Sequence, residues 1–148
     1  GEPVGFIVEL ENGELLTENA VLLQYLASLA PEKKLGRAGE GMDHWRLLET
    51  LNFIATELHK GFSQLFGHPP EEWRAKASEK LAGRFALLAQ TLGDKPYLMG
   101  DFTIADAYAF VMLGWAERFS IPVSDELKAY RQRIANRPAV QQTLGEET

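Results

Sequence analysis

Two polar residues, Glu18 and Asn19, stand where a short apolar stretch ends and a helix is expected to begin. A helix N-terminus presents free backbone N–H groups to an anion, and a carboxylate beside them can meet an ammonium group. The pair therefore suits the zwitterionic head of an amino acid. It also fits an ordinary helix start, with Thr17 or Asn19 as the cap and Glu18 complementing the dipole, and the sequence alone favours that simpler interpretation.

A second group of polar residues recurs at three- and four-residue steps, so its members share one face of a helix. They are Glu49, Asn52, Thr56, His59 and Ser63, with Lys60 adjoining. Such a face lines solvent, a partner subunit or a cleft, and the spacing leaves these alternatives open. The imidazole of His59 titrates near neutrality, so it could polarise a substrate or stabilise a thiolate. The histidines are too scattered along the chain to indicate a metal site.

A third group of residues is aromatic and lies on one apolar segment. Trp115 shares this segment with Tyr108 and Phe110. Aromatic residues at helical spacing belong to a core more often than to a ligand site. The pattern therefore favours packing over binding for these side chains.

The same segment opens with a strong helix start. Thr103 stands at the expected N-cap and Asp106 follows three residues later, which is a capping box with Asp in place of the usual Glu or Gln. Residues 105–116 are almost wholly apolar, and a helix that is apolar on nearly all sides is a buried central helix. Thr103 and Asp106 are thus predicted to be structural residues.

The N-terminal elements that must position Glu18 and Asn19 are short. Residues 5–10 are rich in β-formers and predict a strand, Asn12-Gly13 is a hairpin turn signal, and Leu15-Leu16 predicts a return strand. Residues 20–29 predict a buried helix. Because a hairpin with one helix is not stable alone in water, this unit must pair its strand edge or pack on the rest of the chain.

The remainder of the chain is predicted to be helical. The expected helices span 42–66, 70–92, a central helix after Thr103, 124–136 and a short last helix from Arg137-Pro138. The fold class is therefore mainly α, a β-hairpin plus helix followed by an all-helical domain. We place the partial N-terminal unit at 1–30, a linker rich in glycine at 31–41, and the helical domain at 42–148.

Composition excludes several classes of function. The 148 residues contain no cysteine, which excludes disulfides, thiolate metal sites and a cysteine nucleophile. The net charge is −6 with no long run of Lys or Arg, so we expect no nucleic-acid partner. No apolar run is long enough to span a membrane and no signal peptide is recognisable, so we expect a cytoplasmic protein.

With these segments placed, the chain resembles the cytosolic glutathione transferases, and most closely their bacterial beta class. The segments that carry the resemblance follow one another over nearly the whole chain. They are Leu16-Thr17-Glu18-Asn19 with Gln24-Tyr25-Leu26-Ala27, Leu51 to Phe62, Phe102 to Tyr108 with Gly114-Trp115-Ala116, and Asn136-Arg137-Pro138. The resemblance implies a homodimer in which a thioredoxin-like domain precedes an all-helical domain, and it identifies the capped central helix as a family hallmark.

For glutathione itself, the resemblance implies three binding residues. Glu18 and Asn19 match the positions that bind the γ-glutamyl end, with Asn19 where Ser or Gly is commoner. Asn52 matches a residue that reaches glutathione in the partner subunit. No cofactor is implied, because glutathione is a substrate.

For the second substrate, a small electrophile, the resemblance implies a cleft near the sulfur. His59 and Lys60 match the pair that lines this cleft and are the implied catalytic residues, and Trp115 matches a tryptophan near the electrophile. The family's thiol-activating residue lies in a βαβ unit that has no counterpart in these residues. Gly5-Phe6 stand where the family has Val and a cis-proline.

Three functions are compatible with a chain that has these binding residues but no counterpart of the thiol-activating unit. The first is glutathione conjugation, in which the thiolate attacks an electrophile, and we expect this chain to perform it weakly or not at all. The second is a non-catalytic domain that dimerises or binds a partner, since the exposed hairpin edge favours β-pairing. The third is a protein that holds an apolar compound in its helical cleft.

Overall fold

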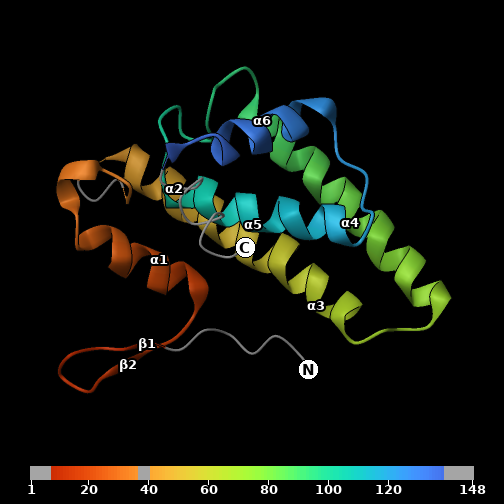
Figure 1. Ribbon diagram of the computed structural model, residues 1–148, viewed down its shortest axis with the longest axis horizontal. Helices are drawn as coiled ribbons and strands as arrows, with labels where there is room; N and C mark the ends of the chain where they lie inside the picture. The colour runs from red at the N-terminus through yellow and green to blue at the C-terminus, as the bar shows by residue number, and fades with distance from the viewer. Residues whose placement is uncertain (1–7, 37–40, 139–148) are drawn as a thin grey trace.

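Helix α5 (Ile104–Arg118) lies in the middle of the structure, a computed structural model that describes residues 8–36 and 41–138 (Figure 1). The other elements are β1 (Val8–Glu9), β2 (Leu15–Leu16), α1 (Asn19–Ser28), η1 (Pro31–Lys33), α2 (Met42–Phe53), η2 (Ile54–His59), α3 (Lys60–Phe66), α4 (Glu71–Leu92) and α6 (Asp125–Ala135). This order confirms the predicted fold class, a mainly helical chain with a β-hairpin and a helix at its N-terminal side.

One continuous core joins the helices around α5. It contains apolar side chains at three- and four-residue steps along the chain from α2 to α3, namely Leu47, Leu51, Ile54, Leu58, Phe62 and Leu65. Helix α4 adds Leu81, Phe85, Leu88 and Leu92, and α6 adds Leu127, Tyr130 and Ile134. Burial of such side chains, each worth about 1.5–3 kcal/mol, explains why the amphipathic segments fold as predicted.

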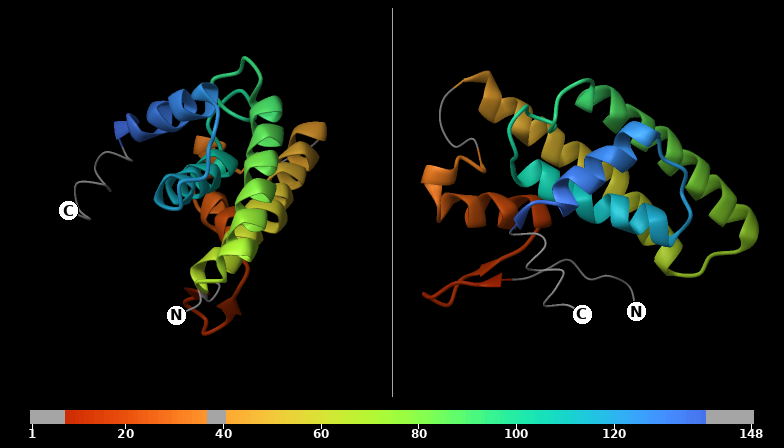
Figure 2. Two further views of the ribbon diagram at one scale, coloured as in Figure 1. Left: turned by 90° about the vertical axis from the view of Figure 1, so that its right-hand side faces the viewer. Right: turned by 45° about the horizontal axis from the view of Figure 1, so that its top comes forward.

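The hairpin stands apart from these helices, beyond α1 (Figure 2). Its two strands are antiparallel, with Val8 opposite Leu16 and Glu9 opposite Leu15. Gly13 has a φ of 87°, and the Leu10 N–H donates to the Glu14 carbonyl at 2.8 Å. The turn thus lies where Asn12-Gly13 predicts it, with a longer loop than the two-residue turn. Residues 5–7 of the predicted strand lie outside the described residues.

The helix predicted over 42–66 is continuous, but its middle is not α-helical. Segment η2, between α2 and α3, is a π-helix. A π-turn holds more residues than an α-turn, so it changes which side chains share a face, and such turns are frequent at functional sites. The sequence did not predict this irregularity.

The capping box predicted at the start of α5 is present and is part of a larger buried network. The Ala105 N–H donates to Thr103 Oγ1 at 3.2 Å, and the Thr103 N–H donates to Asp106 Oδ2 at 2.8 Å. Asp106 Oδ1 also accepts the Leu98 N–H at 3.0 Å and the Tyr130 hydroxyl at 2.5 Å. The carboxylate thus joins α5, the preceding loop and α6.

Burial shifts the pKa of both titratable residues in this network, Asp106 and Tyr130. Burial raises the pKa of Asp106, and the hydrogen bonds that it accepts oppose this shift. Burial and the neighbouring Asp106 charge raise the pKa of Tyr130, so its phenol remains a hydrogen-bond donor. The network is therefore a fixed structural joint.

The remaining predicted boundaries agree with the structure to within a few residues. Helix α1 begins and ends one residue before the predicted span 20–29, and α6 is one residue shorter at each end than the predicted span 124–136. Most of the predicted last helix and residues 37–40 of the predicted linker lie outside the described residues. The two boundaries between the three predicted segments stay predictions.

Candidate functional site

A cavity of about 510 Å³ lies between the start of α1, the α2–η2 stretch and α5. Its lining includes four of the predicted site residues, Glu18, Asn19, Asn52 and His59, together with Tyr108. These residues come from three regions of the chain that are far apart in sequence. The structure thus brings the predicted amino-acid-binding pair to the predicted polar face of the long helix.

The polar stripe divides at this cavity. Asn52, Thr56 and His59 line it, whereas Glu49 and Ser63 are exposed outside it. Of the alternatives that the spacing left open, a cleft is therefore the one that applies to the middle of the stripe. The role of Asn52 in a partner subunit stays a prediction, since Asn52 here faces the cavity of its own chain.

The start of α1 differs from the predicted cap. Glu18 is the N-cap residue and no side chain caps the helix, so the predicted capping by Thr17 or Asn19 is wrong. Glu18 also has a φ of 70° and a ψ of 118°, a backbone conformation that non-glycine residues rarely adopt. Strain of this kind clusters at functional sites, and the uncapped N–H groups of α1 remain available to an anion.

Asn19 does not cap the helix because its side chain is used elsewhere. Its Nδ2 lies 3.2 Å from His59 Nδ1, and the Tyr108 hydroxyl lies 2.6 Å from the same nitrogen. The Tyr108 hydroxyl can donate or accept, but an amide nitrogen only donates, so the Asn19 contact makes His59 Nδ1 the acceptor and places the ring proton on Nε2. The histidine is thereby held in one tautomer, with a fixed orientation.

Burial sets the protonation state of this hydrogen-bonded group. It lowers the pKa of His59, so the imidazole is neutral near pH 7. It also raises the pKa of Tyr108, with an opposing contribution from the hydrogen bond to Asn19 and a further rise from the negative charge of Glu18. At neutral pH the site therefore contains a neutral imidazole and a neutral phenol.

Lys60 does not share the cavity with His59. Consecutive residues of a helix point in different directions, and Lys60 lines a separate groove on the side of α4. Trp115 is close to the site without lining it. Its ring lies 5.2 Å from the His59 ring and 5.0 Å from the Phe66 ring, so it packs behind the histidine.

Tyr108 is the lining residue that the sequence assigned to the core. It is 5% exposed, as a core residue should be, but its hydroxyl reaches His59 from α5. In the sequence, the only sign of this role was one tyrosine within an apolar helix, and that does not indicate which residue its hydroxyl contacts. A buried tyrosine hydroxyl does, however, usually have a hydrogen-bond partner.

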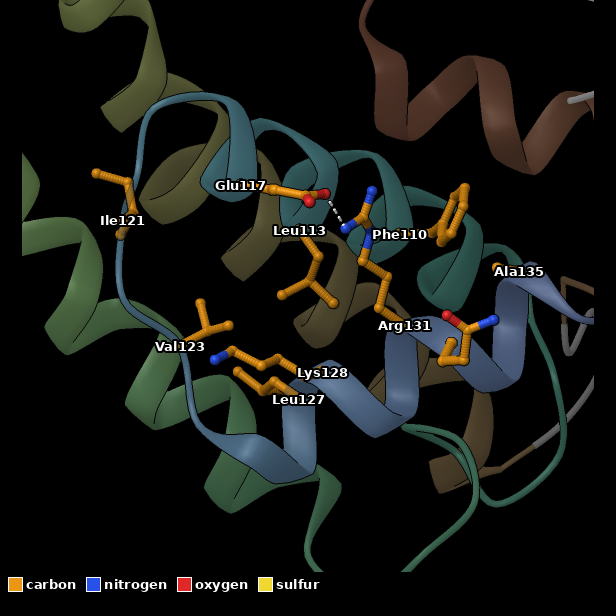
Figure 3. A pocket seen from close by; sticks show the side chains of 10 residues that line it. Phe110, Leu113, Glu117, Ile121, Val123, Leu127, Lys128, Arg131 and Ala135 are labelled. Atoms are coloured by element: carbon orange, nitrogen blue, oxygen red, sulfur yellow. Dashed lines mark hydrogen bonds and ion pairs between the residues drawn. The ribbon is translucent and has the colours of Figure 1, made fainter.

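A second cavity, of about 430 Å³, lies between α5 and α6 (Figure 3). Its floor is apolar, and Arg131 on its rim is paired with Glu117 and lies near Phe110. None of the predicted site residues lines it, and it contains no histidine. The α1–α5 cavity is therefore the candidate site.

In the part of the chain that the structure describes, no group of three or more histidine, aspartate and glutamate side chains is placed to hold a metal ion. Within the same residues, no helix has both the length and the apolar character needed to cross a membrane.

Comparison with known proteins identifies a family. The model of the glutathione S-transferase C-terminal domain matches residues 53–138. The chain is 38% identical over 142 residues to glutathione S-transferase GstA of Escherichia coli O157:H7, an alignment that covers 93% of this chain and 71% of that protein.

Solved structures agree with this match. A sphingomonad glutathione S-transferase complexed with glutathione has a TM-score of 0.86 and 37% identity, with 95% of this chain and 72% of that chain covered. The beta-class enzyme of Sphingomonas chungbukensis has a TM-score of 0.85 and 34% identity over the same shares.

Proposed function

Because this chain belongs to the glutathione S-transferase family, we propose that the α1–α5 cavity binds glutathione, and that the reaction it serves is attack of the glutathione thiolate on a small electrophile. The observation that supports the proposal most directly is the shared lining of this cavity. Glu18, Asn19, Asn52 and His59, which the resemblance implies as binding or catalytic residues, meet there although they were identified from separate motifs.

The γ-glutamyl end of glutathione is an amino-acid head, with an ammonium group and a carboxylate. The Glu18 carboxylate is exposed at the cavity and would pair with the ammonium group. The uncapped backbone N–H groups at the start of α1 would receive the carboxylate. The strained backbone at Glu18 would allow the Glu18 carboxylate and the N–H groups of α1 to contact the same head group.

The described lining of the cavity does little to activate the thiol. A thiolate is the reactive form and is favoured by nearby positive charge. Among the described lining residues the only formal charge is that of Glu18, and the lowered pKa of His59 keeps its imidazole neutral. We therefore propose that this 148-residue chain conjugates glutathione slowly.

Calorimetric titration with glutathione tests binding. Glu18→Gln should weaken binding about tenfold or more, because a hydrogen bond between charged groups is worth about 1.5–3 kcal/mol. Glu49→Gln is the matched control, since Glu49 is an exposed glutamate on the polar stripe that includes Asn52 and His59 but does not line the cavity. Cysteinylglycine, which lacks the γ-glutamyl end, should bind poorly. Equal binding of both compounds would contradict the proposed orientation.

The conjugation rate is tested separately with 1-chloro-2,4-dinitrobenzene. We expect a rate close to that of free glutathione. Fast turnover that is lost in His59→Ala would overturn the proposal of slow conjugation and leave the binding proposal intact.

A second function, pairing with another copy of the chain, is favoured by the exposed apolar residues on the N-terminal unit. Leu15 is 63% exposed on the hairpin, and Leu26 and Leu29 are 54% and 64% exposed on or next to α1. Among the residues that the structure describes, the sheet has two strands, and both are edge strands, which pair readily. Sedimentation should show a dimer at micromolar concentration, and a Leu15→Lys variant should shift it toward monomer.

A further inference from the structure

Two helices bring polar side chains to one nitrogen of His59. Asn19 is the first residue of α1, Tyr108 belongs to α5, and His59 is the last residue of η2. The Asn19 amide nitrogen lies 3.2 Å from His59 Nδ1, and the Tyr108 hydroxyl lies 2.6 Å from it. All three residues line the α1–α5 cavity. The orientation of the imidazole is therefore set by residues far from it in the sequence.

The other ring nitrogen of His59 has no partner within residues 8–36 and 41–138. Nε2 forms no hydrogen bond with them, yet it is not one of the buried polar atoms that are left unsatisfied. It is therefore accessible, in a residue that lines the α1–α5 cavity. Packing also holds the ring, because the Trp115 ring lies 5.2 Å away at an interplanar angle of 77°. Nε2–H is thus one hydrogen-bond donor with a fixed direction.

Asn19 decides which nitrogen of the imidazole carries the proton. A phenol donates or accepts, so the Tyr108 contact alone is compatible with either tautomer. An amide nitrogen only donates, so the Asn19 contact requires an unprotonated Nδ1 and makes Tyr108 a donor as well. Burial raises the pKa of Tyr108, which keeps the proton on its hydroxyl. The two partners therefore differ in role: Asn19 selects the tautomer and Tyr108 strengthens it.

This use of Asn19 differs from the role that the resemblance implies. The resemblance has the residue after Glu18 bind the γ-glutamyl end of glutathione, whereas here the Asn19 amide contacts His59. The start of α1 does not need this side chain to receive a carboxylate, because no side chain caps its backbone N–H groups. The Asn19 side chain therefore belongs with His59 and not with the anion site of the helix.

We propose that Asn19 and Tyr108 are positioning residues for His59. They hold its ring as the Nε2–H tautomer, and this N–H is the donor that the cavity offers to an acceptor group of its ligand. Asn19 thus acts on the ligand through His59 and not by direct contact. The tautomer is a property of the free protein, whereas the identity of the ligand as glutathione rests on the proposed function.

NMR of the free protein tests the tautomer. Long-range ¹H–¹⁵N correlation spectra distinguish the two neutral tautomers from each other and from the imidazolium, and His59→Phe identifies the signals of His59 among the three histidines. At about pH 7.5 we expect the Nε2–H form. Asn19→Asp replaces a donor with an acceptor, so it should shift His59 to the Nδ1–H form or the imidazolium, whereas Tyr108→Phe should retain the Nε2–H form. An Nδ1–H form in the unchanged protein, or an Nε2–H form in Asn19→Asp, would overturn the proposal.

A double-mutant cycle tests whether Asn19 acts through His59. In calorimetric titration with glutathione, Asn19→Ser and Tyr108→Phe should each weaken binding about two- to tenfold, the net contribution of a neutral hydrogen bond. His59→Phe keeps an aromatic ring beside Trp115 but removes the donor. In this background the same two replacements should add less than about twofold. Full losses in both backgrounds would show direct contact with the ligand and would contradict the positioning role.

Matched controls make the same replacements away from the cavity. Asn136 and Tyr97 form their hydrogen bonds elsewhere and do not line it, so Asn136→Ser and Tyr97→Phe should change the affinity less than about twofold. Losses in these controls as large as the loss in Asn19→Ser would indicate general destabilisation and would count against the proposal. If the unchanged protein binds no glutathione, the proposed function fails, and the NMR result alone decides whether Asn19 and Tyr108 position His59.

Discussion

Helices α5 and α1 differ in how the free backbone N–H groups of their first turns are satisfied. Every helix begins with backbone N–H groups that have no partner within the helix. At α5, Thr103 and Asp106 satisfy such groups, and both side chains are fully buried. At α1, Glu18 stands at the N-cap in a strained conformation, and no side chain caps the helix. One start is built for stability, whereas the other keeps its donors available for a ligand.

The largest expected effect comes from breaking the capped start. Asp106→Ala would leave the Leu98 N–H, the Thr103 N–H and the Tyr130 hydroxyl without their buried acceptor. Each buried unsatisfied donor costs about 1–3 kcal/mol, so we expect a loss of about 3–5 kcal/mol in the free energy of unfolding. Urea denaturation followed by circular dichroism measures it.

Because Asp106→Ala could abolish folding, Tyr130→Phe provides a milder test of the same joint. It removes one donor and keeps the two backbone bonds to Asp106, so it should cost about 1–2 kcal/mol. A change of less than about 0.5 kcal/mol in both variants would show that the network is not a structural joint.

A smaller effect of the opposite sign is expected at the uncapped start. Glycine adopts the backbone conformation of Glu18 without strain, so Glu18→Gly should stabilise the fold by about 1 kcal/mol. The same variant should bind glutathione more weakly because the carboxylate is lost. Thermal unfolding and calorimetry measure the two effects. Destabilisation by Glu18→Gly would contradict the idea that strain is retained here for binding. Glu49→Gly is the contrasting control, because glycine within a regular helix lowers stability.

The same two regions show what the sequence can predict. The α5 capping box follows from residues three positions apart, so a local rule was sufficient to predict it. The contacts of His59 join residues 40 and 49 positions away, Asn19 and Tyr108, and only the packed helices bring them together. The local rule failed at α1 because it assumed that the side chain of Asn19 was free to cap.

The separation of His59 from Lys60 has a similar cause. The resemblance placed both residues at one cleft, but neighbouring helical positions point in different directions, so packing assigns them to different surfaces. The π-helical segment that ends at His59 is another feature that periodicity does not reveal. Apart from this π-helical segment, helices and strands were predictable from local pattern, whereas the grouping of side chains depended on tertiary packing.

The smallest expected effect tests the protonation state of His59. Burial lowers the pKa of folded His59 below its ordinary value of about 6.5, so the unfolded chain binds a proton at this residue more readily. The contribution of neutral His59 to stability is therefore complete above about pH 6.5 and decreases as the pH falls below it. Thermal unfolding between pH 7.5 and pH 5.5 should show a small decrease in midpoint that His59→Gln reduces. His68→Gln, at an exposed histidine, should leave the decrease unchanged. A decrease that is identical in all three proteins would show that His59 is not buried as a neutral acceptor, and that the α1 side of the molecule is more open to solvent than its hydrogen bonds indicate.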